Sequence, residues 1–418
     1  MSELDRRTLL GGLPAAASAA RLPQGPAASE SAGRLKITRL VYYRSTIRWR
    51  DLLFVEVHTD EGITGVGEAT VNAFARTVEA GIRELEDLVI GKDPFSPRRI
   101  TESLRRDLYT DGGQVHGCVV AAIEVACFDI MGKALNTPIY TLLGGKYRDR
   151  IRTYANGWYR GERTPENIAK RAQAAVALGY TALKFDPFGD AYRVISRYEE
   201  DLSIDIVSAV RSAVGPNIEL LIEGHSRFTV ATAITLGYRL QPHRIGWFEE
   251  PVPHHRIASV VEVSRNAPVP IATGESFHSV CQFAELLKFD TVHILQPEPM
   301  SLGGIQPLVD VAVMAEAHNC MISPHCAQGP IGSYISMHIA AACPNCYLKE
   351  HFDDFEVDWV KDLIIGNMKH EEGHLTIPDT PGLGVTLNLD AIKKRVSKEN
   401  RYIALFKPGW EMRDKYGD

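Results

Sequence analysis

The sequence predicts an α/β protein in which a parallel α/β barrel of the TIM type is joined to a smaller α+β domain, called here the capping domain. From residue 151 onward, short apolar segments alternate with segments of helical periodicity, as is typical of βα units. Three apolar segments run into a glutamate, namely Glu223, Glu249 and Glu275, each 26 residues after the one before. One strand, one helix and two short loops occupy about that length. The three acids therefore take the same position in successive units.

Length and composition narrow the class of protein. The chain has 418 residues, of which 45% are hydrophobic and 23% are charged. This length agrees with one barrel plus a smaller domain. The net charge of −6 provides no basic surface for nucleic acid, and no apolar run approaches the length that spans a bilayer. We therefore expect a soluble enzyme with a small-molecule partner and without a nucleic-acid or membrane partner.

The seven cysteines are an odd number in apolar surroundings, so we expect free, buried thiols. Cys343 and Cys346 form a CxxC motif, but no second CxxC and no nearby histidine pair completes a zinc site. We interpret this motif as structural.

Residues 1–33 do not have the pattern of a folded segment. Arg6 and Arg7 precede a stretch of small residues, which resembles a twin-arginine export signal. The alternative is a disordered, alanine-rich tail. The first interpretation predicts a periplasmic protein and the second a cytoplasmic one.

Residues 34–150 are expected to form the capping domain. Three antiparallel strands are predicted at 36–43, 52–59 and 63–69, followed by helices over 77–90 and 114–135. The basic loop 44–50 contains Arg48 and Arg50, which either remain solvated or contact an anionic substrate.

Residues 151–372 are expected to form the barrel, and 373–418 a tail that returns to the capping domain. Helices are predicted over 165–178 and 204–214. The eight barrel strands are predicted at 152–156, 182–185, 219–222, 245–248, 270–273, 291–295, 321–323 and 347–350.

The ends of these strands carry the candidate chemistry. Ligands of parallel barrels bind at the carboxyl ends of the strands. Three glutamates that converge there cannot all remain ionised without a cation, and oxygen ligands select Mg²⁺ or a similar ion. Glu223, Glu249 and Glu275 are therefore predicted metal ligands. His225 and His325 also stand at strand ends and are the candidates for proton transfer.

The glutamate ladder resembles that of the enolase superfamily, in its mandelate racemase branch. The resemblance rests on Glu223, Glu249-Glu250-Pro251 and Gly274-Glu275, and it extends over nearly everything after residue 34. Further matching segments are 122–126, 132–134, 142–145, 296–297, 303–305 and 377–384. Within the branch, 154–159 and 182–189 look most like gluconate and galactonate dehydratases.

The resemblance implies Mg²⁺-dependent dehydration of a sugar acid, such as D-gluconate or D-galactonate, to a 2-keto-3-deoxy acid through an enediolate. It implies a (β/α)7β barrel over which the α+β capping domain closes. It also implies one Mg²⁺ per subunit, with Mn²⁺ as a substitute, and a homo-oligomer. His325 is then the base at C2 and His225 the acid at C3, although the two can exchange roles if the C2 configuration is opposite. The alternatives are a dehydratase or epimerase for another acid sugar, and a non-catalytic sugar-acid-binding protein.

The same resemblance implies roles for five further residues. Glu298 is expected to orient His325, at a position where many relatives have aspartate. Asp186 stands where racemases of the branch keep a lysine, which argues against racemisation. The residues expected to contact or brace the substrate are Lys184, Asp186, Glu350 and Arg227, with a structural ion pair as the alternative for Lys184.

Overall fold

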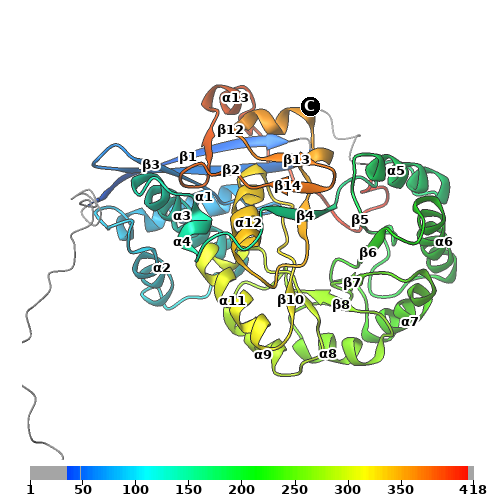
Figure 1. Ribbon diagram of the computed structural model, residues 1–418. Helices are drawn as coiled ribbons and strands as arrows, with labels where there is room; N and C mark the ends of the chain where they lie inside the picture. Colours follow the sequence, from blue (N-terminus) through cyan, green and yellow to red (C-terminus); the bar gives the residue numbers. More distant parts are fainter. Residues whose placement is uncertain (1–34, 48, 413–418) are drawn as a thin grey trace, which may run out of the picture.

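The computed structural model describes residues 35–47 and 49–412. It contains a closed barrel with a smaller α+β layer against one side (Figure 1). The predicted export segment, 1–33, lies outside the described residues. The fold class predicted from the sequence is confirmed.

The barrel consists of eight parallel strands. Strands β4 to β10 pair in sequence order, β11 pairs with β4, and a bridge between Ile322 and Cys346 closes the ring. The strands are β4 (Arg150–Ala155), β5 (Ala182–Phe185), β6 (Glu219–Glu223), β7 (Trp247–Glu249), β8 (Ile271–Thr273), β9 (Ile294–Leu295), β10 (Met321–Ile322) and β11 (Lys349–His351). The predicted strand 291–295 is shortened to β9, because only Ile294 and Leu295 pair with the neighbouring strands.

One or more helices cross between each pair of successive strands and cover the outside of the ring (Figure 1). They are α5 (Pro165–Ala177), α6 (Arg197–Val214), α7 (Val230–Leu240) with η2 (Gln241–His243), α8 (Ile257–Asn266), α9 (Val280–Leu287), α10 (Pro299–Leu302), α11 (Ile305–Ala317) and α12 (Pro330–Ala342). Inside the ring, Tyr154 meets Trp247 edge to face at 5.6 Å, and five further apolar side chains complete a separate interior core. Side chains thus fill the interior of the barrel.

The capping domain begins with an antiparallel meander, β1 (Ile37–Ile47), β2 (Arg50–Thr59) and β3 (Thr64–Glu68). The predicted loop 44–50 is instead the tip of the β1–β2 hairpin, because pairing continues to Ile47 opposite Arg50. Arg50 is buried, and its Nη2 lies 2.9 Å from Glu356 Oε1, so it forms a structural ion pair. Arg48 lies outside the described residues.

Helices α1 (Ala75–Leu85), η1 (Glu86–Leu88), α2 (Pro97–Arg106), α3 (Gly113–Ala134) and α4 (Ile139–Leu142) complete this domain. Contrary to the sequence-based expectation, helix α3 is long and apolar enough to cross a membrane. However, 83% of its apolar 18-residue stretch is buried inside the protein, as in a core helix. It also ties the domains together, because the Glu124 carboxylate accepts hydrogen bonds from Ile305 N at 2.8 Å and Gln306 N at 2.9 Å at the start of α11.

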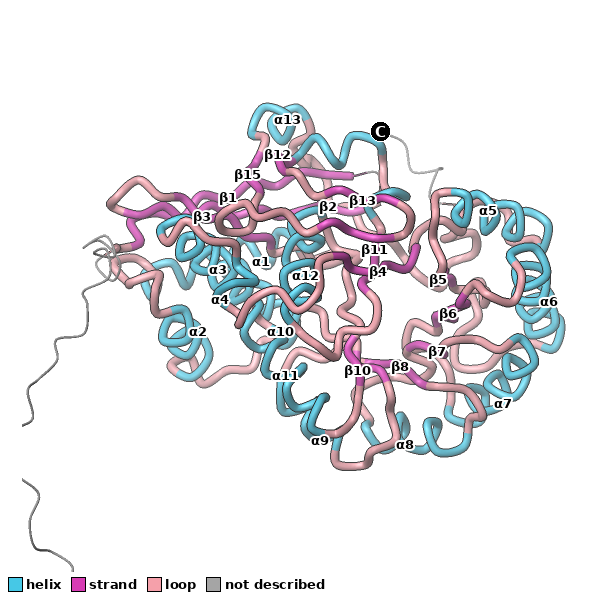
Figure 2. The backbone as a smooth tube through the Cα atoms, viewed as in Figure 1, coloured by secondary structure: helices cyan, strands magenta, loops and turns pink. Residues whose placement is uncertain are grey.

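The C-terminal segment contacts both domains (Figure 2). Strand β14 (His374–Thr376) pairs with β4, and β15 (Val385–Leu387) pairs with β12 (Ile364–Gly366). Arg395 O, just after α13 (Leu389–Lys394), accepts hydrogen bonds from Ser45 Oγ and Thr46 N of β1. Trp410 reaches the barrel, where its Nε1 donates to Gly189 O at 3.0 Å. The remaining elements are η3 (Asp353–Phe355), η4 (Asp358–Leu363) and β13 (Lys369–Glu371).

All seven cysteines are free. Six are buried, as expected, whereas Cys281 is exposed on α9. Burial raises the pKa of the Cys343 thiol to about 11 and that of Cys346 to about 12, so both thiols stay protonated at neutral pH.

Candidate active site

Three glutamates converge at the carboxyl ends of adjacent barrel strands. Glu223 ends β6, Glu249 ends β7 in register with it, and Glu275 follows β8 after a single glycine. One carboxylate oxygen from each lies within 4.8 Å of the others. Glu223 and Glu249 are buried, and Glu275 is partly exposed. The structure thus brings together the three predicted metal ligands.

The electrostatics of this glutamate triad fit a divalent cation. Burial and the neighbouring Glu223 carboxylate raise the pKa of Glu249 to about 8, and burial raises the pKa of Glu275. Carboxylates this close resist full ionisation unless positive charge is placed between them. An all-oxygen ligand set of this kind suits Mg²⁺ or Mn²⁺.

Lys184, on β5, supplies one positive charge beside the triad. Its Nζ lies 2.5 Å from Glu249 Oε1, 2.9 Å from Glu350 Oε1 and 3.3 Å from Glu223 Oε2. Burial lowers the pKa of Lys184, but these carboxylates outweigh burial and hold it well above its usual value. The side chain is therefore a buried ammonium at the level of the glutamates. It forms an ion pair with them, and its contact with the substrate stays a prediction.

His325 is held by a carboxylate at the Glu275 end of the triad. Its Nδ1 lies 2.6 Å from Glu298 Oε2, and its Nε2 lies 3.3 Å from Glu275 Oε2. The other Glu298 oxygen accepts from Met300 N at 3.0 Å, so the start of α10 fixes this carboxylate. The side chain of Glu298, which is one methylene longer than that of aspartate, thus still forms this contact with His325. Burial opposes a charge on His325, but Glu275, Glu350 and Glu298 outweigh burial and raise its pKa to about 10.

His225 has a matching arrangement at the Glu223 end. Its Nδ1 lies 2.7 Å from Asp186 Oδ2, and its backbone N donates to Glu223 Oε1 at 2.6 Å. His225 and Ser226 both have positive φ angles, of 48° and 55°. This left-handed pair, which is costly for residues other than glycine, turns the chain sharply after β6. The ring of His225 also meets that of Trp410 edge to face at 5.8 Å.

Asp186 and Arg227 lie behind His225. Asp186 is 3% exposed and accepts from Phe188 N as well as from the Arg227 guanidinium, which is itself 1% exposed. Arg227 also donates to Gly189 O at 2.7 Å and to Gly224 O at 2.9 Å. Asp186 and Arg227 are thus buried and engaged with each other, and Asp186 holds His225; their contact with the substrate stays a prediction.

Glu350, on β11, lies between Lys184 and His325. Its Oε1 contacts Lys184 and accepts from Asn156 Nδ2 at 2.7 Å, and its Oε2 accepts from Cys326 N at 2.6 Å. Burial raises the pKa of Glu350, but Lys184 and His325 outweigh burial and lower the pKa to about 2. Glu350 is therefore ionised, as a buried counter-charge.

A cavity of about 480 Å³ opens over Glu275 and His325, between the capping domain and the barrel. From the capping domain it is lined by Val71, Asn72, Phe74, Gly112, Gln114 and Val115. His254 and His278 line the barrel side, and sequence reasoning missed both. Each histidine lies a few residues after a strand whose end carries a predicted metal ligand, and this position would have been enough to predict it. Trp410 was missed as well, and the sequence near it carries no such signal.

Comparison with known proteins agrees with this geometry. Residues 35–144 match the N-terminal domain of the mandelate racemase/muconate lactonizing enzyme family, and residues 167–391 match a domain described as enolase C-terminal domain-like. The chain therefore belongs to the enolase superfamily and, within it, to the mandelate racemase/muconate lactonizing enzyme family.

Relatives with assigned names are similar over most of the chain. A D-galactonate dehydratase from Ralstonia pickettii strain 12J is 34% identical over 87% of this chain and 95% of its own. A D-gluconate dehydratase from Thermoproteus tenax is 33% identical over 88% of this chain and 74% of its own. The crystal structure of a mandelate racemase/muconate lactonizing enzyme from Jannaschia sp. CCS1 superimposes with a TM-score of 0.83, at 31% identity over 88% of this chain and 99% of that one.

Proposed function

We propose that this chain is a sugar-acid dehydratase, a hydro-lyase whose substrate is an aldonate such as D-gluconate or D-galactonate. The observation that carries the proposal is a histidine–carboxylate pair at each end of the glutamate triad, Asp186–His225 and Glu298–His325. In both pairs Nδ1 faces the carboxylate, which leaves Nε2 for proton transfer. The names of the relatives supply the substrate class.

Glu223, Glu249 and Glu275 would hold one Mg²⁺, with Mn²⁺ as a substitute. When bound, the cation supplies positive charge opposite the substrate carboxylate, where negative charge builds up as the C2 proton leaves. Lys184 adds a fixed ammonium beside the same position. A cation would also offset the effect of Glu275 on His325 and lower the pKa of that imidazole, so that it becomes neutral and can accept a proton.

The proton transfers then divide between the two histidines. His325 removes the C2 proton through Nε2, while Glu298 stabilises the resulting imidazolium. His225 donates a proton to the C3 hydroxyl, which leaves as water. The enol product tautomerises to a 2-keto-3-deoxy acid, so that the net change is the loss of one water molecule.

Two rival activities remain on the same scaffold, the dehydration of another acid sugar and epimerisation. Asp186 is engaged with His225 and Arg227, and it stands where an epimerising enzyme needs a second base. The arrangement therefore favours elimination. A sugar-acid-binding protein without activity has no need of two oriented histidines.

A panel of sugar acids with Mg²⁺, assayed for keto acid with semicarbazide, tests the proposal. We expect keto acid from gluconate or galactonate and none after chelation. Deuterium at C2 of the recovered substrate without any keto acid would support epimerisation instead. Binding without either change would support the non-catalytic alternative.

A further inference from the structure

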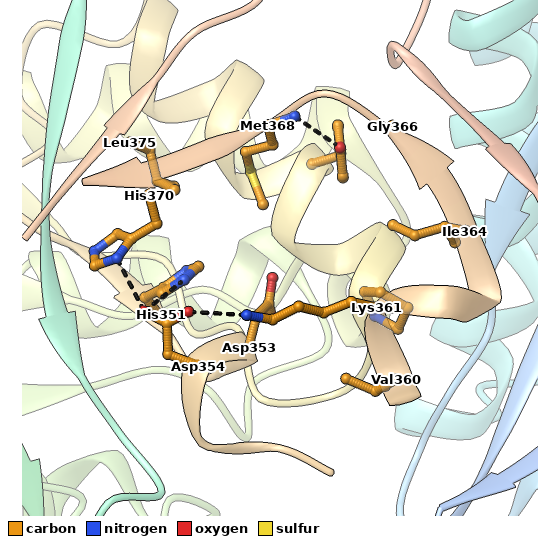
Figure 3. A pocket seen from close by; sticks show the side chains of 12 residues that line it. His351, Asp353, Asp354, Val360, Lys361, Ile364, Gly366, Met368, His370 and Leu375 are labelled. Carbon is orange, nitrogen blue, oxygen red and sulfur yellow. Dashed lines mark hydrogen bonds and ion pairs between the residues drawn. The ribbon is translucent and has the colours of Figure 1, made fainter. Parts of the chain in front are cut away.

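A second group of metal-ligating side chains lies where barrel strand β11 meets the C-terminal segment, separate from the glutamate triad. His351 comes from β11, Asp354 from η3 and His370 from β13, and one ligand atom of each lies within 4.8 Å of the others. They line a cavity of about 220 Å³, in which His351, Asp354 and His370 point toward one another (Figure 3). We call these three residues the His–Asp–His cluster.

The hydrogen bonds of His370 leave one ring nitrogen directed at the cluster. Thr153 Oγ1 donates its single proton to Gly373 O at 2.8 Å. The same hydroxyl lies 3.0 Å from His370 Nε2 and must therefore accept a hydrogen bond from it. This contact places a ring proton on Nε2. Nδ1 lies 2.9 Å from Asp354 Oδ2, at hydrogen-bond distance, and a metal ion that takes the place of the shared proton would be bound by both groups. Metal-binding histidines are commonly oriented in this way, through the other ring nitrogen.

His351 provides an independent observation. It is 2% exposed, and neither of its ring nitrogens has a hydrogen-bond partner. Its Nε2 lies 3.8 Å from Asp354 Oδ2, and its ring stacks on that of His370 with centroids 4.4 Å apart. A buried imidazole without hydrogen bonds is costly, and a cation beside Asp354 would give its Nε2 a partner.

We propose that the His–Asp–His cluster binds a divalent transition metal ion, for which Zn²⁺ is the natural probe. Two imidazole nitrogens and one carboxylate suit zinc and its neighbours, whereas the all-oxygen triad suits Mg²⁺. The cavity of about 220 Å³ that the cluster lines leaves room for a water molecule as a fourth ligand. Lys361, which contacts Asp354 Oδ1 at 3.1 Å, has a side chain that is 59% exposed, so it can move away at little cost.

The position of the cluster gives the ion a structural role. His351 follows Glu350 on β11, and His370 belongs to the β13–β14 hairpin, which pairs with β4. The ion therefore fastens the hairpin to the barrel strand that carries Glu350. No member of the cluster lines the cavity over Glu275 and His325.

Spectroscopic titration tests the site without an activity assay. The full chain, stripped with a chelator, is saturated with Mg²⁺ to occupy the triad and titrated with Co²⁺, then with Zn²⁺ in competition. We expect one equivalent of Co²⁺ with the visible absorption of a low-coordinate N/O site, displaced by Zn²⁺. His370→Gln should weaken this binding by at least about 10- to 100-fold, as expected for the loss of a metal ligand or its support.

Two controls separate the cluster from other sites. His374→Gln changes a histidine of the same hairpin outside the cluster, and Glu223→Gln disables the triad; both should keep the Co²⁺ signal. The proposal is overturned if His370→Gln binds Co²⁺ as tightly as the parent chain, or if Glu223→Gln abolishes the signal. If His370→Gln does not fold, Asp354→Asn takes its place. Because no substrate is used, a failed dehydratase assay leaves this result unaffected.

Discussion

Each of the two site histidines depends on one carboxylate for its orientation. Glu298 holds His325 and Asp186 holds His225, in both cases through Nδ1. A carboxylate in this position fixes the tautomer and stabilises the imidazolium when a proton arrives. Individual substitutions should therefore act on turnover more than on folding.

Glu298→Gln tests the carboxylate that holds His325. The amide retains the size of the side chain but can present the wrong hydrogen-bonding group to His325 Nδ1. We expect kcat for keto acid formation to fall by on the order of 10²- to 10⁴-fold, with substrate KM changed much less. An unchanged circular dichroism spectrum serves as the folding control. Near-normal turnover would show that Glu298 does not orient the base.

Replacing each histidine separately tests which one is the base. In D₂O, His225→Asn should still exchange the C2 proton of the substrate while keto acid formation is lost, because His325 remains intact. His325→Asn should lose both reactions. NMR of the recovered substrate measures the exchange. The opposite pattern would assign the base to His225.

At the scale of elements, helix α12 joins three parts of the chain through a buried histidine. His338 Nδ1 accepts from Tyr140 N at 3.3 Å, and Nε2 donates to Leu383 O at 3.1 Å. The neutral ring satisfies both contacts, whereas the imidazolium cannot accept from Tyr140. Burial lowers the pKa of His338 from 6.5 to about 4, despite the opposing contact with Leu383 O.

Acid should therefore destabilise the protein through His338. Its contribution is fully present above the unfolded pKa, near 6.5, and is lost as the pH falls toward 4, because the unfolded chain binds the proton first. The total effect is up to about 3 kcal/mol. Denaturant unfolding between pH 7 and pH 4 measures it, with His338→Gln as the comparison. If the variant loses as much stability as the parent over this range, another group is responsible.

At the scale of the molecule, the site needs both domains. The cavity is bounded by capping-domain residues such as Asn72 and Gln114 and by the barrel residues Glu275 and His325. Glu124 fixes the two layers together by capping α11 from α3. Without a bound metal ion, the carboxylates of the glutamate triad also repel one another, which destabilises the folded chain.

Binding of Mg²⁺ should consequently raise the thermal stability of the whole chain. At a concentration 100 times Kd, we expect about 2.7 kcal/mol of stabilisation. Calorimetry with Mg²⁺ and after chelation provides the measurement. Glu249→Gln, which removes one ligand and part of the repulsion, should abolish most of the shift. An equal shift in that variant would mean that Mg²⁺ acts elsewhere.

Several features were accessible from the sequence because they are local. The 26-residue spacing of Glu223, Glu249 and Glu275 follows from the length of one βα unit, and the parallel fold brings their strand ends together. The same logic placed His225 and His325 beside the triad, where the structure has them.

Tertiary structure alone decided which side chains meet across distant segments. Pairing with Leu53 and its neighbours turned loop 44–50 into a hairpin, burial placed Asp186 and Arg227 behind His225, and the C-terminal segment carried Trp410 to the same histidine. The His–Asp–His cluster likewise arises only where β11, η3 and β13 come together. Residue type and spacing determine which reactive side chains stand at the ends of the strands. Packing between remote elements determines which of these side chains contact one another in the site.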